Sequence, residues 1–241
     1  GALPPEAREA LTDYVQGQGF GDEPRVVEEV RQWLRGRSID RVECLWERLM
    51  YLAARLRESF SVPGMSRAQT AIFRDKEAMK QAVEKAGLRV PRHGRARSTQ
   101  EAWAAVERCG FPAIVKPIDG AGSKDTYRCN DEQEFEAALQ KVRHIEELSV
   151  EEFIEGEELT YDTVCADGRI LFENVAWYKP KPMILAQNPW ISMQNIVLRD
   201  LTQELPRPGV ELGHGVLKAL GFQTGFTHME WFRTSKGEAV F

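Results

Sequence analysis

The stretch from Phe111 to Thr160 constrains the fold more than any other part of the chain. It opens with the apolar run FPAIVKP, in which Lys116 comes last before proline, and continues through the loop GAGSKDT. A helical pattern follows, and then a second strand pattern, LSVEEFIEGEELT, with paired acids. Glycine lets a loop approach a ligand closely, and inward-pointing N–H groups bind phosphate. The stretch therefore predicts a site for a nucleoside triphosphate and its metal ion.

The composition allows a folded protein and narrows the classes of partner. The chain has 241 residues, of which 42% are hydrophobic, which is enough for buried cores in one or two domains. Its net charge of -5 argues against a broad nucleic-acid surface, which normally needs a basic excess. We therefore expect no nucleic-acid partner, while a local basic pocket for an anionic ligand stays open.

The cysteines indicate in which cellular compartment the protein functions, and the end of the chain suggests that the sequence is a fragment. Cys44, Cys109, Cys129 and Cys165 form no CxxC unit, which predicts free thiols in a reducing, cytoplasmic setting. No run reaches the roughly 18 apolar residues of a membrane span, and no signal peptide is visible, so we expect no membrane partner. The chain stops at Phe241 within a strand pattern, and we expect a fragment of a longer protein.

Helices and a strand alternate in the first part of the chain. The spacing of apolar residues predicts helices over 5–16, 24–35 and 45–56, and a short strand over 39–45. This alternation is typical of an α/β layer.

The remainder of the chain reads as mixed helices and strands. Asp75 and Gly87 bracket a predicted helix over 76–86, and the capping box at 98–101 opens a helix that ends at Cys109. Asp167-Gly168 predicts a tight turn between two halves of a hairpin over 159–178. The other predicted elements are strands over 111–116, 127–129, 148–154, 225–233 and 238–241, helices over 131–143 and 208–220, and a loop over 179–190.

Five motifs in this order resemble the ATP-grasp superfamily. They are FRDKEAMKQAVEKAGLRVP (73–91), FPAIVKP (111–117), GAGSKDT (120–126), VEEFIEGEELT (150–160) and FTHMEWF (226–232). The branch of carbamoyl-phosphate synthase, biotin carboxylase and D-alanine–D-alanine ligase is the most similar. The loop fits neither GxxxxGK[ST] nor GxGxxG, which disfavours a Walker-type NTPase and a dinucleotide fold. The resemblance implies an α/β plus α+β fold with a partial N-terminal α/β domain (1–90), a lid (91–150) and a truncated C-terminal subdomain (151–241).

The resemblance assigns phosphate contacts to two lysines and the glycine loop. Taken alone, Lys76 would be a solvated lysine, Lys116 would be a strand-end salt bridge and the loop an ordinary turn. In the ATP-grasp family, these positions surround the phosphates. The implied phosphate ligands are Lys76, Lys116, Gly120, Gly122, Ser123 and Lys124.

Adenine and ribose contacts are implied for the strand that follows. The backbone of Glu152 and Ile154, with Phe153 between them, would read the adenine edge, and Glu151 would lie near the adenine amino group. Glu158 would accept hydrogen bonds from the ribose hydroxyls, a task that suits a carboxylate with two acceptor oxygens. A solvated acidic hairpin is the alternative interpretation of this stretch.

A metal ligand is implied on the FTHMEWF strand. A carboxylate among aromatic residues fits a Mg²⁺ ligand, and the resemblance gives this role to Glu230, with Mn²⁺ as a second suitable ion. The family's second ligand would fall beyond Phe241. His228 either contacts phosphate or packs, and no catalytic residue is identified.

The implied activity is that of an ATP- and magnesium-dependent ligase. It would activate a carboxylate as an acylphosphate for attack by an amine, with both substrates small molecules. Three alternatives remain: a carboxylase or carbamoyl-phosphate-type enzyme that phosphorylates bicarbonate, an ATP-binding module without turnover, and a Rossmann-type reductase. A homodimer is compatible with the sequence, which does not reveal the acid or the nucleophile.

Overall fold

The computed structural model describes residues 3–17, 19–119, 124–188 and 190–241. The chain divides into two compact units, Gly1–Thr70 and Ala71–Phe241. None of the helices in the described ranges combines the length and apolarity that crossing a membrane requires.

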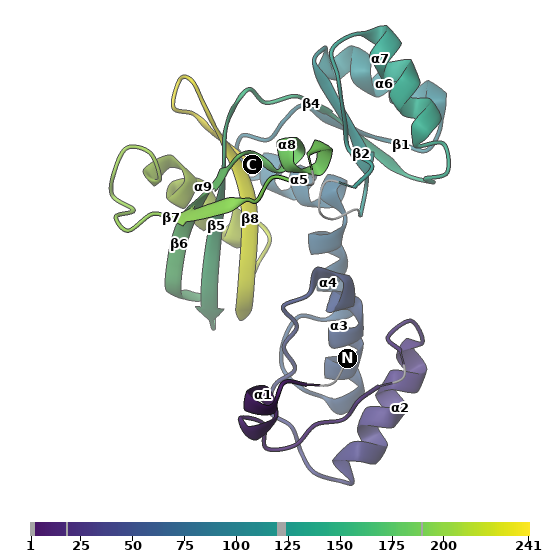
Figure 1. The fold of residues 1–241 in the computed structure, drawn as a ribbon, viewed down its shortest axis with the longest axis vertical. Helices are drawn as coiled ribbons and strands as arrows, with labels where there is room; N and C mark the ends of the chain where they lie inside the picture. Colours follow the sequence, from purple (N-terminus) through teal and green to yellow (C-terminus); the bar gives the residue numbers. More distant parts are fainter. Residues whose placement is uncertain (1–2, 18, 120–123, 189) are drawn as a thin grey trace. The chain divides into compact units, whose positions relative to one another are not determined.

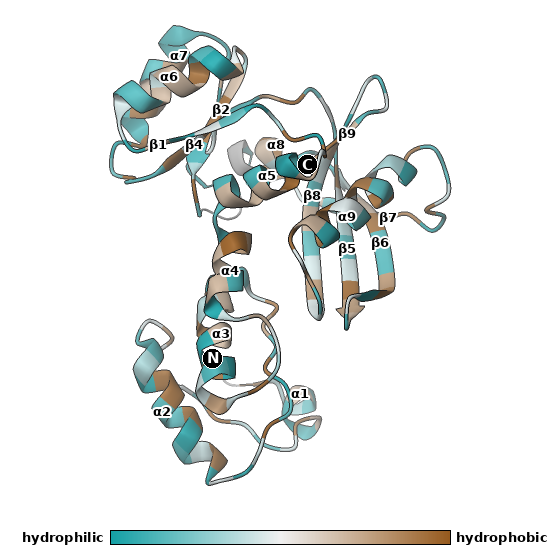
Figure 2. Cartoon of the chain, turned by 180° about the vertical axis from the view of Figure 1, so that it is seen from behind, coloured by the Kyte–Doolittle hydropathy of each residue, from teal (hydrophilic) through white to brown (hydrophobic). Residues whose placement is uncertain are grey.

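The first unit is built from helices. They are α1 (Pro5–Glu9), α2 (Glu23–Leu34), the 3-10 turn η1 (Glu47–Leu49), α3 (Met50–Phe60) and the start of α4 (Arg67–Arg74). Asp22 caps α2 by accepting the Arg25 N–H, and polar and apolar stretches alternate along this helix (Figure 2). The strand expected over 39–45 is wrong. A strand needs a hydrogen-bonded neighbouring strand, and the described residues of this unit contain no strand that could pair with 39–45.

A small antiparallel sheet forms one layer of the second unit. It contains β1 (His93–Ala96), β2 (Ala113–Pro117), β3 (Tyr127–Cys129) and β4 (Leu148–Glu152) in the order β1-β4-β2-β3. Helices α6 (Thr99–Cys109) and α7 (Glu132–Lys141) lie together on one face (Figure 1). Val115, Phe135 and Val150 are fully buried in this core. Strand alternation therefore turns Lys116, Ser149 and Glu151 to the opposite face.

A larger antiparallel sheet forms the other layer. It contains β5 (Gly156–Ala166), β6 (Arg169–Lys179), β7 (Gln194–Val197), β8 (Gly225–Thr234) and β9 (Ala239–Val240) in the order β7-β6-β5-β8-β9. The predicted hairpin is confirmed: β5 pairs with β6 around Asp167 and Gly168, whose φ angles are 51° and 74°. The segment 179–190, expected to be a loop, contains helix α8 (Pro182–Gln187).

Helix α9 (Arg207–Ala219) covers one face of this larger sheet (Figure 1). Leu159, Tyr161 and Trp231 point into the interface with it and are almost fully buried. Helix α9 can approach the sheet closely because it has glycine where it meets the aromatic rings of the sheet. A Cβ on Gly209 would stand 2.1 Å from the Trp231 ring, and one on Gly213 would stand 2.3 Å from the Tyr161 ring.

Helix α5 (Lys76–Lys85) is shared by both layers of the second unit. Asp75 caps it by accepting the N–H groups of Glu77 and Ala78, as predicted. Val83 is fully buried and belongs to the core under the larger sheet. Glu77 and Lys80 contact the uncovered face of the small sheet, by which we mean the face that α6 and α7 do not cover. The mixed helix-and-sheet fold class is thus confirmed, with two antiparallel sheets.

Candidate nucleotide site

A buried ionic cluster joins α5 to the uncovered face of the small sheet. Lys80 Nζ lies 2.5 Å from Glu151 Oε1, 2.9 Å from Ser149 Oγ and 3.0 Å from Glu77 Oε1. Ser149 Oγ lies 2.7 Å from Glu77 Oε1, and His93 Nδ1 lies 2.7 Å from Glu77 Oε2. Glu77, Lys80 and Glu151 are buried, so each of their charges depends on these partners.

The cluster keeps both of its carboxylates ionised. Burial alone would raise the pKa of Glu77, but His93, Lys80 and Ser149 outweigh burial and lower that pKa to about 2. Burial likewise opposes ionisation of Glu151, and the charges of Lys116 and Lys80 overcome it, so the pKa of Glu151 lies far below its usual value.

Lys116 joins the cluster from the outside. Its Nζ lies 2.8 Å from Glu151 Oε2, and its side chain keeps 25% of its exposure. Lys116 and Glu151, which the sequence analysis assigns to phosphate and to adenine, are therefore in direct contact with one another here.

Lys76 lies at the base of the glycine loop. Its Nζ donates to the carbonyl of Ile118 at 3.3 Å, and Arg74 Nη2 donates to the carbonyl of Asp119 at 2.6 Å. These carbonyls directly precede the loop, of which Gly120, Gly122 and Ser123 lie outside the described residues, while Lys124 is exposed. Two cationic side chains thus hold the start of the loop that the sequence predicts to contact phosphate.

The segment between β4 and β5 contains a buried backbone N–H group with no partner among the described residues. The N–H of Glu152 donates to the Arg92 carbonyl at 2.8 Å, and that of Phe153 to the Pro112 carbonyl at 3.0 Å. The N–H of Ile154 has no hydrogen-bond partner among the described residues, although Ile154 is only 8% exposed. A polar group of this kind is available to a ligand.

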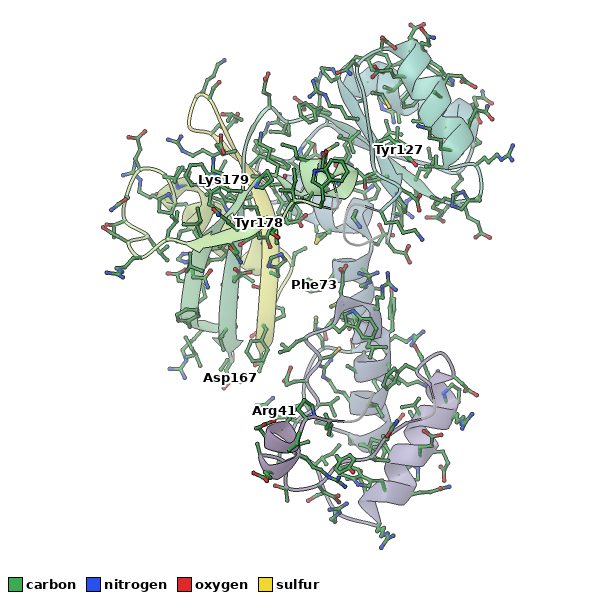
Figure 3. The ribbon with its side chains drawn as sticks, viewed as in Figure 1. Arg41, Phe73, Tyr127, Asp167, Tyr178 and Lys179 are labelled. Carbon is green, nitrogen blue, oxygen red and sulfur yellow. The ribbon has the colours of Figure 1, made fainter. Side chains whose placement is uncertain are left out.

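The open face of the larger sheet carries a row of polar side chains. Cross-strand pairing places Thr160 opposite Glu230 and Asp162 opposite His228, on the face turned away from α9. Glu158 lies on the same face, one pleat repeat from Thr160. Tyr178, which precedes Lys179 at the end of β6 (Figure 3), has its hydroxyl 3.5 Å from His228 Nε2.

Glu158 is the most perturbed carboxyl of this face. It is only 9% exposed, and burial together with the negative charge of Glu230 raises its pKa to about 7. The positive charges of Lys181 and Lys116 oppose this rise. Lys116 on the small sheet is therefore close enough to Glu158 on the larger sheet for its positive charge to act on that carboxyl.

Glu230 is exposed, and the carboxylates around it are few. Among the described residues, no three side chains of His, Cys, Asp or Glu gather as a ready metal-binding group. Asp162 Oδ1 instead lies 2.5 Å from His228 Nδ1, and Thr160 Oγ1 donates to Asp162 Oδ2 at 3.1 Å. The assignment of Glu230 as a metal ligand stays a prediction.

Several residues of this region escaped the sequence analysis. Lys80 reads as an ordinary helix residue, because two of its partners, Ser149 and Glu151, come from the distant strand β4. Ser149 and His93 carry no motif signal. Lys181, whose positive charge acts on Glu158, is the N-cap residue of helix α8. The sequence did not reveal this helix.

Comparison with known proteins shows what this region is similar to. Residues 73–176 match the sequence profile described as an ATP-grasp domain. Over 211 residues, the chain is 28% identical to an L-arginine-specific L-amino acid ligase of Bacillus subtilis, covering 83% of this chain and 49% of the relative. A D-alanine–D-alanine ligase of Fusobacterium nucleatum subsp. nucleatum is 36% identical over 91 residues, covering 38% of this chain and 28% of the relative.

A solved structure has the same fold. The L-amino acid ligase of Bacillus licheniformis superposes with a TM-score of 0.74 at 24% identity, covering 92% of this chain and 52% of that one. The chain spans about half or less of the length of these curated relatives.

Proposed function

The chain carries an ATP-grasp domain over residues 73–176, and we propose that it binds ATP with Mg²⁺ as part of a ligase. One observation carries the proposal. Lys116 on the small sheet and Glu158 on the larger sheet, which we assign to phosphate and ribose, lie close enough for the positive charge of Lys116 to oppose the raised pKa of Glu158. A nucleotide bound between the two sheets would contact both side chains.

The phosphates would be held from the small sheet. Lys116 supplies a positive charge whose partner, Glu151, is shared with Lys80. Lys76 lies at the start of the glycine loop, and we assign phosphate contacts to it, to Lys124 and to the loop positions Gly120, Gly122 and Ser123. Lysine and backbone N–H groups suit this task, because they present donors and positive charge to phosphate oxygens.

The base and sugar would be held by the segment that joins the sheets. The unused N–H of buried Ile154 is a donor for an adenine ring nitrogen, and the carbonyl of Glu152 is an acceptor for the adenine amino group, with Phe153 between them. Glu158 would accept the ribose hydroxyls as a carboxylate, and these two donors would favour its ionised form.

A divalent cation fits the open face of the larger sheet. Burial and, after it, the negative charge of Glu230 raise the pKa of Glu158, so this face brings two carboxyl groups close together. Oxygen ligands of this type suit Mg²⁺ and also Mn²⁺. When bound, such an ion would stabilise the negative charge that develops during phosphoryl transfer.

The reaction that we propose joins a carboxylate to an amine. A substrate carboxylate oxygen attacks the terminal phosphorus, the bond to ADP breaks, and an acylphosphate forms. The amine then attacks the acyl carbon, phosphate leaves, and the amine loses a proton to give an amide. The chain contributes positioning and electrostatic stabilisation, and closure over the site would protect the acylphosphate from water.

Calorimetric binding of the non-hydrolysable analogue AMP-PNP, with and without MgCl₂, tests the nucleotide site. We expect binding that strengthens with Mg²⁺, and a folded chain that binds no AMP-PNP would contradict the proposal.

A screen of amino acids, other small carboxylates and bicarbonate for ADP release then tests the ligase, in the longer protein if one exists. We expect release that needs both an acid and an amine. Release with bicarbonate alone would instead favour a bicarbonate-phosphorylating enzyme, and binding without release would favour a module without turnover.

A further inference from the structure

We propose that Lys80 is a positioning residue that keeps Glu151 neutralised, so that Lys116 can leave Glu151 and contact a nucleotide phosphate. This inference rests on the proposed nucleotide site. It assigns different tasks to two lysines that touch the same carboxylate.

The two lysines hold different oxygens of Glu151. Lys80 Nζ lies 2.5 Å from Oε1, whereas Lys116 Nζ lies 2.8 Å from Oε2. Either lysine can therefore withdraw without displacing the other. Glu151 itself is 5% exposed, so water cannot replace a lost partner.

The surroundings of the two lysines are unequal. Lys80 is 5% exposed and has three oxygen partners, on Glu151, Ser149 and Glu77. Lys116 has one oxygen partner among the described residues, and its side chain keeps 25% of its exposure. Lys80 is thus fixed within the cluster, and Lys116 is the lysine that can turn toward a ligand.

Each carboxylate of the cluster keeps a hydrogen-bonding partner in both arrangements. With Lys116 in place, two lysines face the carboxylates of Glu77 and Glu151. When Lys116 turns to phosphate, Glu151 keeps Lys80, and Glu77 keeps Lys80 and His93. Without Lys80, Lys116 would be the one lysine left beside the buried Glu151 carboxylate. If Lys116 then turned away, the negative charge of Glu151 would be buried without a cationic partner.

This inference predicts that Lys80→Met weakens AMP-PNP binding with Mg²⁺ at least tenfold, because Glu151 then retains Lys116. Lys80→Arg, which restores the charge, should bind within about threefold of the unchanged chain. Lys85→Met removes an exposed lysine from the end of the same helix and serves as the matched control. Calorimetry measures affinity, and circular dichroism checks the fold of each variant.

Adenosine separates positioning of Lys116 from general damage. It lacks phosphates, so Lys80→Met should change its affinity, measured by ligand-observed NMR, less than threefold. Equal losses for adenosine and AMP-PNP would overturn the inference, as would unchanged AMP-PNP affinity in folded Lys80→Met.

A double variant tests the coupling to Glu151 directly. Glu151→Gln removes the charge that retains Lys116, so Lys80→Met/Glu151→Gln should bind AMP-PNP within about threefold of Glu151→Gln alone. A tenfold gap between these two variants would show that Lys80 acts by another route and would overturn the inference.

Should Lys80→Met fail to fold, chemical acetylation of lysines in the unchanged chain tests whether Lys116, and not Lys80, contacts the nucleotide. Mass spectrometry should show Lys80 protected with and without AMP-PNP, and Lys116 protected further only when AMP-PNP is bound. Nucleotide-induced acetylation of Lys80, or no change at Lys116, would overturn the inference. An unchanged chain that binds no AMP-PNP would instead remove the proposed function on which the inference rests.

Discussion

Lys116 on β2 and Glu151 on β4 meet across neighbouring strands, with Nζ 2.8 Å from Oε2. Lys80 contacts the other oxygen of the same carboxylate. A lysine held in this way can be removed without leaving Glu151 unpaired, which makes it a clean target for mutation.

We expect Lys116→Ala to weaken ATP binding at least tenfold, about 1.4 kcal/mol. The loss would come from the missing phosphate contact, because Lys80 still neutralises Glu151 and the fold should persist. Calorimetry with AMP-PNP measures the affinity, and Lys218→Ala, an exposed lysine on α9, is the control. Unchanged affinity in folded Lys116→Ala would contradict the phosphate assignment.

Glu158 should make stability depend on pH near neutrality. Its pKa in the fold is about 7, against 4.5 for the ordinary carboxyl, so the folded state favours the protonated form. The stabilisation is complete below pH 4.5 and is lost as the pH rises through 7, by up to about 3 kcal/mol. Urea unfolding between pH 4.5 and 8 should therefore show a fall in the free energy of unfolding of the unchanged chain relative to Glu158→Gln.

The window of this pH effect is separate from that of the ionic cluster. Glu77 and Glu151 have lowered pKa values, so their contribution is present above their ordinary pKa of 4.5 and is lost at lower pH. Parallel pH profiles for Glu158→Gln and the unchanged chain above pH 4.5 would show that Glu158 is not perturbed in this way.

Glu230→Gln tests the metal assignment. The amide keeps the shape of the side chain but loses the charge that attracts a divalent cation. We expect Mg²⁺ to strengthen AMP-PNP binding by the unchanged chain and to have little effect on the variant, and magnesium-dependent ADP formation to be abolished in the complete protein. Glu211→Gln, which changes an exposed residue of α9, is the control. Full retention of the Mg²⁺ effect would reject Glu230 as a ligand.

Gly213→Ala should destabilise the second unit by about 1–3 kcal/mol through overpacking. The added Cβ would stand 2.3 Å from the buried Tyr161 ring, so α9 or the ring must shift. Urea unfolding measures the loss, with Lys218→Ala on the same helix as the reference. Equal stability of the two variants would show that the helix adjusts without cost.

The sequence predicted the elements whose pattern is local. Asp75 and Ser98 mark helix starts through their own hydrogen bonds, and Asp167-Gly168 closes a hairpin between adjacent runs. The hairpin, β8, β9 and α9 were predicted on this basis, whereas β7 and the pairing of β5 with β8 were not.

Elements that depend on distant partners were harder to predict. β1 is the polar run HGRA, which forms a strand because β4 pairs with it. The run over 39–45 has the apolar content of a strand but meets no neighbour among the described residues of its unit. Lys80 likewise reads as an ordinary helix residue until Glu151 and Ser149 are brought to it.

Because α5 serves both layers, the place at which the second unit is divided for expression matters. A fragment that begins at residue 91, the predicted start of the lid, would lose Lys80 and leave Glu151 and Ser149 without that partner. The same cut would remove Val83 from the interior beneath the larger sheet. Expression of this unit should therefore keep residues 71–241 together, since α5, near its start, packs against both sheet layers.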